Sequence, residues 1–437
     1  VKAKVIGEGA NLGATQQGRI DFALSGGRIN TDFIDNSAGV NSSDQEVNIK
    51  ILLSHLFDPT NKTQETKRNK LLESMTEDVA EAVLTNNYQQ TQALSLMGMN
   101  ARDEFSYYMR LITQFEHRLD MDRALESLPT LEEAEIRYDT GESFTRPELA
   151  TILCYAKIMF YNDLLASDVP DMDSAEGWLM DYFPEKLQKK YDDEIKEHSL
   201  RREIIATQIT NSVVNRVGPS FIYRCAERTG AKAEDVVRAY LFVRQMLSLP
   251  SMWKEIEDLD NKLPASVQLK CFNEILRLVE HCMIWFLSRP ALLKKEKVLT
   301  GDFCKHFDAL IKLLPGILPD ELTQKYDGRL AENKADGLTQ SLSHRIALCQ
   351  NLVSCLDIIK LCLDSNLSIK EAAELYYGLG DVLSIVWLRN QARGLQSDNS
   401  WDKEAIRGLI DQLFDSQSQI ALHAIAVKKE SKGKTSV

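Results

Sequence analysis

The feature that most constrains the fold is the uneven distribution of glycine along the chain. Residues 1–57 hold seven of the 21 glycines, whereas the other 14 are spread over the remaining 380 residues. Dense glycine indicates tight turns and close approach of the backbone. The glycine-poor part carries apolar residues at three- and four-residue steps, which is typical of amphipathic helices. The sequence therefore predicts a mainly α protein, with a short α/β segment (1–57), a large helical domain (58–427) and a polar, disordered tail (428–437).

The first segment predicts an alternation of strand and helix. The expected elements are, in order, a strand at 4–6, a helix at 16–24 capped by Thr15 and ended by Gly26 and Gly27, an extended piece at 28–32, a loop at 35–40 and a helix that opens at Ser42 or Ser43. A strand–helix–strand unit this compact belongs to an α/β sheet. Because one such unit cannot form a stable domain by itself, we expect its partner strands to lie outside this sequence.

The remaining sequence predicts a series of helices with recognisable ends. One begins at Thr76. Residues 145–148 (TRPE) form a capping box with proline in the first turn of a long helix. An apolar stripe over 204–217 is stopped by Gly218.

Charge and cysteine usage exclude several classes of function. With 52 basic and 64 acidic residues the net charge is −12, which argues against non-specific binding of nucleic acid or of an anionic membrane. The longest uncharged apolar run, 282–287, is far too short to span a bilayer. None of the eight cysteines forms a C-x-x-C pair, and most lie in apolar helical patterns, so we expect reduced core thiols of a cytoplasmic protein and no metal site.

The glycine-rich stretch at 7–13 follows a strand and precedes a helix. Loops of this kind let backbone N–H groups approach the pyrophosphate of a dinucleotide at a helix N-terminus. The spacing is G-x-G-x-x-x-G, and no strand ending in an acidic residue follows at the expected distance. By itself the stretch therefore favours a simple tight βα turn over a dinucleotide-binding loop.

Longer motifs make the interpretation more specific. They are GEGAN at 7–11, GGRINTD at 26–32, DNSAGV at 35–40, LLESMT at 71–76, NNY at 86–88, TRPELA at 145–150, TNSVVNR at 210–216 and LDNKLP at 259–264. Together they resemble the large NAD-specific glutamate dehydrogenases of bacteria, over essentially the whole sequence. The loop departs from the pattern of the small enzymes of this group at Ser37.

The resemblance implies oxidative deamination of L-glutamate to 2-oxoglutarate and ammonia, with NAD as the cofactor. It implies that residues 1–57 are the end of a Rossmann-like nucleotide-binding domain and that the enzyme is a homo-oligomer. By position, it assigns cofactor binding to Gly9, Ala10, Asn11 and Asn36, and substrate binding to Val40 and Ser43. An amide side chain offers both a donor and an acceptor, which suits a contact between Asn36 and the nicotinamide carboxamide.

Three of these residues have structural alternatives that stay open. Asn11 could occupy a left-handed turn position. Asn36 could close the loop through an Asx-turn. Ser43 lies three residues before Glu46 and could open a helix as a capping-box serine.

The sequence also lacks groups that the resemblance requires. The catalytic lysine, the catalytic aspartate and the primary glycine fingerprint of the family lie upstream of such a region, and none is matched here. Asp32 and Asp35 are expected to cap loops. Since residue 1 is Val rather than Met, we expect a piece of a longer enzyme that is inactive without its N-terminal part. The alternative is a helical scaffold or regulatory domain for assembly or effector binding.

Overall fold

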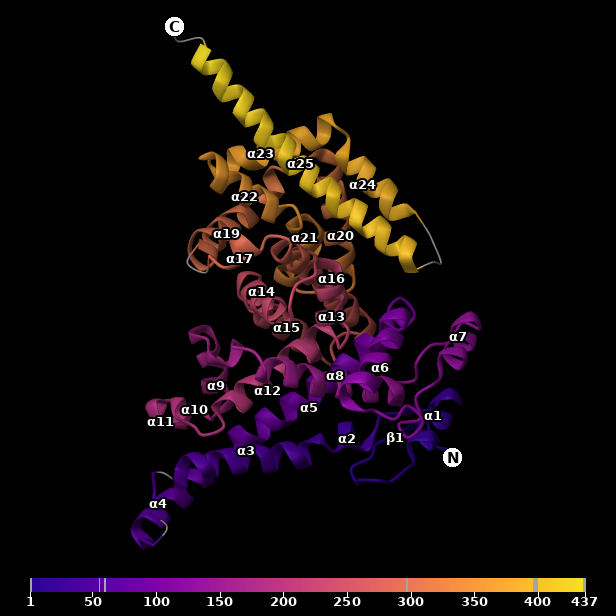
Figure 1. The fold of residues 1–437 in the computed structure, drawn as a ribbon, viewed down its shortest axis with the longest axis vertical. Helices are drawn as coiled ribbons and strands as arrows, with labels where there is room; N and C mark the ends of the chain where they lie inside the picture. Colours follow the sequence, from indigo (N-terminus) through magenta and orange to yellow (C-terminus); the bar gives the residue numbers. More distant parts are fainter. Residues whose placement is uncertain (1, 55, 59, 296–297, 396–399, 435–437) are drawn as a thin grey trace. The chain divides into compact units, whose positions relative to one another are not determined.

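The computed structural model describes residues 2–54, 56–58, 60–295, 298–395 and 400–434. Helices dominate these residues, and they contain one small parallel sheet of two strands. The prediction of a mainly α fold with a short α/β beginning is therefore confirmed (Figure 1). The chain forms two compact units, residues 1–238 and 239–437.

The α/β beginning is one strand–helix–strand unit. Strand β1 (Val5–Ile6) pairs in parallel with β2 (Arg28–Ile29), and α1 (Gln16–Leu24) connects them. The Thr15 hydroxyl caps α1 by accepting from the Gly18 N–H. The helix ends at Ser25, and Gly26 then takes φ +85°, a conformation that glycine adopts without strain. These elements agree with the predicted strand, cap and helix end.

The predicted loop at 35–40 is wrong. Instead, α2 (Asp32–Asp35) leads through Asn36 directly into α3 (Ser37–Ser54). Helix α3 therefore begins several residues before Ser42, although Gly39 lowers the local helix propensity. The reason is tertiary: Asn87, on α5, donates from Nδ2 to the Ile34 carbonyl and to the Ser37 hydroxyl, both at 2.8 Å.

The first unit contains further helices, several of which contact α8 or α12. They are α4 (Lys62–Glu73), α5 (Thr76–Asn100), α6 (Phe105–Leu119), α7 (Leu131–Asp139), α8 (Arg146–Leu165), α9 (Glu176–Tyr182), α10 (Glu185–Gln188), α11 (Asp192–Lys196), α12 (Arg201–Val217) and α13 (Phe221–Thr229). Short 3₁₀ turns at Val169–Asp171 and Asp173–Ala175 join α8 to α9. Helix α5 lies along both α3 and α12 (Figure 1).

Three predicted helix ends are confirmed in this unit. Helix α5 begins at Thr76. At the start of α8 the Glu148 carboxylate accepts from the Thr145 N–H at 2.6 Å, as in a capping box. Helix α12 ends at Val217, where Gly218 takes φ +91°.

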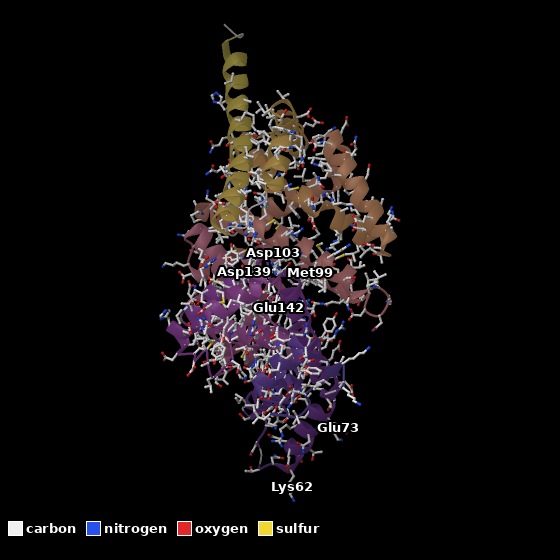
Figure 2. All side chains as sticks on the ribbon, turned by 90° about the vertical axis from the view of Figure 1, so that its right-hand side faces the viewer. Lys62, Glu73, Met99, Asp103, Asp139 and Glu142 are labelled. Carbon is white, nitrogen blue, oxygen red and sulfur yellow. The ribbon has the colours of Figure 1, made fainter. Side chains whose placement is uncertain are left out.

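Side-chain contacts also fix the connections between helices of this unit. Arg102 donates to the carbonyls of Tyr138, in α7, and of Glu142. Figure 2 shows the neighbouring labelled side chains Met99, Asp103, Asp139 and Glu142 on the same face. The end of α5 is thereby joined to the end of α7, just before α8 begins.

The second unit is entirely helical in its described residues. Its helices are α14 (Ala233–Met246, which spans the boundary), α15 (Leu249–Glu257), α16 (Ala265–Leu287), α17 (Pro290–Leu293), α19 (Cys304–Leu313), α20 (Asp320–Ala335), α21 (Gln340–Leu352), α22 (Cys355–Ser365), α23 (Ile369–Val382), α24 (Ile385–Gly394) and α25 (Ser400–Lys434). A π-helical turn at Leu299–Phe303 and a 3₁₀ turn at Leu314–Gly316 flank α19.

The predicted disordered tail at 428–437 overlaps helix α25, which continues to Lys434. Residues 435–437 lie outside the described residues. Among the described helices, no single one combines the length and apolar composition needed to cross a membrane. Helices α21 and α22, bent at 63° to each other, meet that criterion as a pair.

Candidate functional site

The glycine-rich turn between β1 and α1 is held by two aspartates of α2. Asp35 Oδ2 accepts from the Glu8 N–H at 2.9 Å, and Asp32 Oδ2 accepts from the Leu12 N–H at 2.8 Å. The expectation that Asp32 and Asp35 cap a loop is confirmed, and the loop that they cap is this turn. Each aspartate accepts a hydrogen bond from a backbone N–H at one end of the turn, where regular secondary structure supplies no acceptor.

A buried ion cluster lies beneath the turn. Arg19, on α1, donates to both carboxylate oxygens of Glu8, from Nε at 2.7 Å and from a terminal nitrogen at 2.6 Å. The same terminal nitrogen lies 3.2 Å from Asp32 Oδ1. All three side chains are buried. Sequence reasoning missed this cluster; its one visible signal was an arginine beside the apolar Ile20 in the first turns of a helix.

Asn11 and Asn36, both predicted to bind the cofactor, lie in direct contact. Asn36 Nδ2 donates to Asn11 Oδ1 at 2.9 Å, at an exposed position on the turn. The left-handed alternative for Asn11 is wrong, since the residue with positive φ is Leu12 (φ +59°). A Cβ atom on Gly39 would stand 2.9 Å from Asn36 Oδ1, so only glycine leaves the Asn36 amide in this position.

The other predicted site residues are exposed on the turn and on α3. Gly9 and Ala10 are exposed in the turn. Val40 is 72% exposed, and Ser43 follows it one helical turn later on the same face of α3. Ser43 lies inside α3 rather than at its start, so the capping-box alternative is wrong. Seven residues of helix place Ser43 about 10 Å along the axis from Asn36.

The side of α3 that carries Asp44 and Asn48 is anchored to the helical part of the first unit. Asn48 Nδ2 donates to the Tyr182 hydroxyl at 2.8 Å, and that hydroxyl donates to Asp44 Oδ2 at 3.0 Å. Burial raises the pKa of Tyr182 well above its ordinary value, so the phenol keeps its proton. His198 Nε2 lies 3.1 Å from the Asn48 carbonyl oxygen. Helix α3 is thus fixed along this side, whereas Val40 and Ser43 are exposed.

The arrangement suits recognition of an amide or a carboxylate. After the Asn11–Asn36 bond is made, Asn36 Oδ1 remains an acceptor and Asn11 Nδ2 remains a donor. Across the residues that the structure describes, no group of three His, Cys, Asp or Glu side chains could hold a metal ion.

Comparison with known protein families covers both parts of the chain. The family described as glutamate dehydrogenase, C-terminal, matches residues 141–437. The family described as bacterial NAD-glutamate dehydrogenase, catalytic domain, matches residues 1–97. The second match contains the glycine-rich turn, Asn36 and all of α3.

Curated relatives match almost the full length of this chain. NAD-specific glutamate dehydrogenases from Halomonas elongata and Pseudomonas aeruginosa are 37% and 38% identical over 97% and 98% of it. That from Mycobacterium tuberculosis is 32% identical over 98%. The chain spans about a quarter (26%) of the length of each of these relatives. With family matches over 1–97 and 141–437, the chain belongs to the family of bacterial NAD-specific glutamate dehydrogenases.

Proposed function

We propose that the complete natural polypeptide containing this sequence oxidises L-glutamate to 2-oxoglutarate and ammonia with reduction of NAD. In this proposal residues 7–43 form one wall of the active site. The observation that carries the proposal is the Asn11–Asn36 amide pair, which is followed on the exposed face of α3 by Val40 and Ser43. The names of the relatives support the choice of cofactor and substrate.

The amide pair supplies the polar groups that a carboxamide requires. The bond between the two side chains leaves Asn36 Oδ1 as an acceptor and Asn11 Nδ2 as a donor, and a nicotinamide carboxamide needs one of each. Bound NAD supplies the hydride acceptor. The exposed backbone of Gly9 and Ala10 leaves room for a ligand to approach the turn closely.

Val40 and Ser43 are placed to meet the amino-acid substrate. The Ser43 hydroxyl can donate a hydrogen bond to a carboxylate, and Val40 offers an apolar surface to an aliphatic chain. Both side chains are exposed on α3, which is fixed by the contact between Asn48 and Tyr182.

Proton transfer in this reaction requires an amine and a carboxylate beside the substrate. No lysine in the α/β segment has a matched catalytic role, and Asp32 and Asp35 hold the turn. We therefore propose that both groups come from a segment outside these residues. The present chain is expected to show no turnover by itself.

The proposal is tested by following NADH formation from glutamate and NAD with the complete polypeptide. Asn36→Ala should raise the KM for NAD, and Ser43→Ala should raise the KM for glutamate, each about tenfold for one lost hydrogen bond. Ser54→Ala is the matched control, because Ser54 lies at the far end of the same helix and its hydroxyl donates to the Ile51 carbonyl. No NADH formation by a folded wild-type polypeptide would contradict the proposed activity.

We further propose that the enzyme is cytoplasmic and homo-oligomeric. Six of the eight cysteines are buried, and all eight are free thiols, as is usual in a reducing compartment. Exposed apolar side chains such as Val382, Trp387 and Leu395 supply surface for contact between subunits. Light scattering on the complete polypeptide would measure the subunit number. A monomer with full activity would contradict the proposed homo-oligomer. It would also leave the alternative role of the helical region, as a scaffold for assembly, without support.

A further inference from the structure

We propose that Arg146 is a positioning residue of the nucleotide site and that it acts through Asn30 and Asp35 on the backbone of the glycine-rich turn. The inference rests on the proposed function, since it assumes that this turn faces the cofactor. It also assigns a role to the helical region, because Arg146 belongs to the stretch that matches the C-terminal family, whereas the turn belongs to the catalytic one.

Arg146 is the first residue of α8, and all three of its guanidinium nitrogens are engaged. Nε donates to Asn30 Oδ1. One terminal nitrogen donates to the Ser95 hydroxyl at 3.1 Å and the other to the Thr91 carbonyl at 2.9 Å, both on α5. The guanidinium is therefore fixed by α5, and its third contact holds a single side chain of the α/β segment.

The hydrogen bonds from Arg146 to the turn run in one direction. A guanidinium can only donate, so Asn30 must present Oδ1 to it. This leaves Asn30 Nδ2 to donate to Asp35 Oδ1 at 2.6 Å. The other oxygen of Asp35 then accepts from the Glu8 N–H at 2.9 Å. Arg146 thus selects which way the Asn30 amide points and places the acceptor for the start of the turn.

The contact from Arg146 matters because it holds the Asn30 side chain against Asp35. Without Arg146 the Asn30 oxygen loses its donor, and the side chain can rotate away from the Asp35 carboxylate. The Glu8 N–H would lose a well-placed partner, and Gly9 and Ala10, which follow it, would lose their fixed start. Asp32 would still hold the other end of the turn at Leu12.

The inference can be tested by exchanging donor and acceptor within the relay. Asn30→Asp places two carboxylates in contact and should raise the KM for NAD about tenfold or more, with a smaller change in kcat. Asp35→Asn should have a similar effect, because one of its two contacts then becomes mismatched. The double variant Asn30→Asp/Asp35→Asn restores every donor–acceptor pair from Arg146 to Glu8. It should therefore recover most of the wild-type KM.

Hydrogen exchange at the Glu8 amide supplies a readout that does not depend on turnover. In the complete polypeptide we expect faster exchange at Glu8 in each single variant and recovery in the double variant. Arg146→Lys should also accelerate exchange, since one ammonium cannot satisfy three separated acceptors. Arg102→Lys is the control, because the Arg102 guanidinium donates to the carbonyls of Tyr138 and Glu142 and takes no part in the described contacts of Asn30 or of the α8 cap.

The outcomes separate this inference from the proposed function. Equal impairment of the single and double variants, with all of them folded, would overturn the relay. Unchanged exchange at Glu8 in Asn30→Asp and Arg146→Lys would also overturn it. If exchange follows the predicted pattern but the wild type forms no NADH, the relay holds and the dehydrogenase assignment fails.

Discussion

Gly39 shows how one missing side chain can serve a neighbouring functional group. Gly39→Ala should leave the unfolding free energy unchanged or raise it, because alanine favours helix over glycine by about 1 kcal/mol. Its Cβ would, however, stand 2.9 Å from Asn36 Oδ1 and displace that amide. We expect an unchanged or higher melting temperature together with a KM for NAD raised about tenfold. An unchanged KM for NAD in this variant would show that cofactor binding does not depend on the position of the Asn36 amide.

The Glu8–Arg19–Asp32 cluster predicts a large effect on stability. Arg19→Met removes the only cation paired with the two buried carboxylates in the described contacts and should lower the unfolding free energy by about 3 kcal/mol. Urea denaturation would measure the loss. The variant Arg19→Met/Glu8→Gln should be more stable than Arg19→Met alone, because it removes one uncompensated charge.

At the residue scale, the sequence identified positions in a continuous motif better than positions defined by distant partners. Asn11 and Asn36 were both predicted from such motifs, and their side chains are in contact. Their role in cofactor binding stays a prediction. Arg19 and Arg146 were missed as members of the site. Their partners lie 11 and 116 positions away, and no local pattern encodes such a contact.

At the scale of the element, the start of α8 carries a testable cap. Glu148 is fully buried, and it accepts from the Thr145 N–H and hydroxyl and from Arg137. Thr145→Ala should lower the unfolding free energy by about 1 kcal/mol, whereas Thr145→Ser should have little effect. Because Arg146 follows the cap directly, Thr145→Ala should also accelerate exchange at the Glu8 amide. Chemical denaturation and hydrogen exchange would check the two effects.

Helix ends were predictable where side chains close to the end specify them, as at Thr15, at the Thr145 cap and at Gly218. The start of α3 was not, because it depends on Asn87, fifty residues from Ser37 in the sequence. Local propensity around Gly39 favours a loop, and the contact with α5 overrides it.

At the scale of the whole molecule, the second unit should respond to pH through one buried carboxyl. Asp357 is 1% exposed, and it accepts from the Trp285 indole at 2.7 Å. Burial raises the pKa of Asp357 to about 6, although the Trp285 hydrogen bond and the charges of Arg289 and Arg389 oppose the shift; Asp415 adds to it.

The sign of this effect is fixed by the raised pKa. The folded state binds the proton of Asp357 more tightly than the unfolded state, so the stabilisation is complete below about pH 4 and is lost as pH rises through 6. We expect the second unit to unfold less readily at pH 5 than at pH 7, by an amount on the order of 1–2 kcal/mol. Asp357→Asn should abolish this difference. Urea denaturation, monitored by hydrogen exchange with mass spectrometry, would measure it for the second unit. If Asp357→Asn showed the same difference in stability between pH 5 and pH 7 as the wild type, the difference would come from other titratable groups.

The division of the chain into units could not be read from composition. The change in glycine density near residue 57 reflects local backbone geometry, whereas the compact units are 1–238 and 239–437. The predicted domain boundary at 57 stays a prediction. Helix α3 begins among the site residues, but its fixed face packs on α5 and contacts Tyr182.

The anchoring of α3 determines where the gene could be divided for reassembly from two expressed pieces. A cut near residue 57 would separate Asn30 from Arg146 and Ser37 from Asn87. It would also part Gln16 from the Pro147 carbonyl, which its amide contacts at 3.2 Å. Each piece would then carry one half of each contact that joins the α/β segment to α5 and α8. A break point after the first unit keeps all of these pairs on one piece, so a split polypeptide designed there keeps the proposed cofactor wall intact.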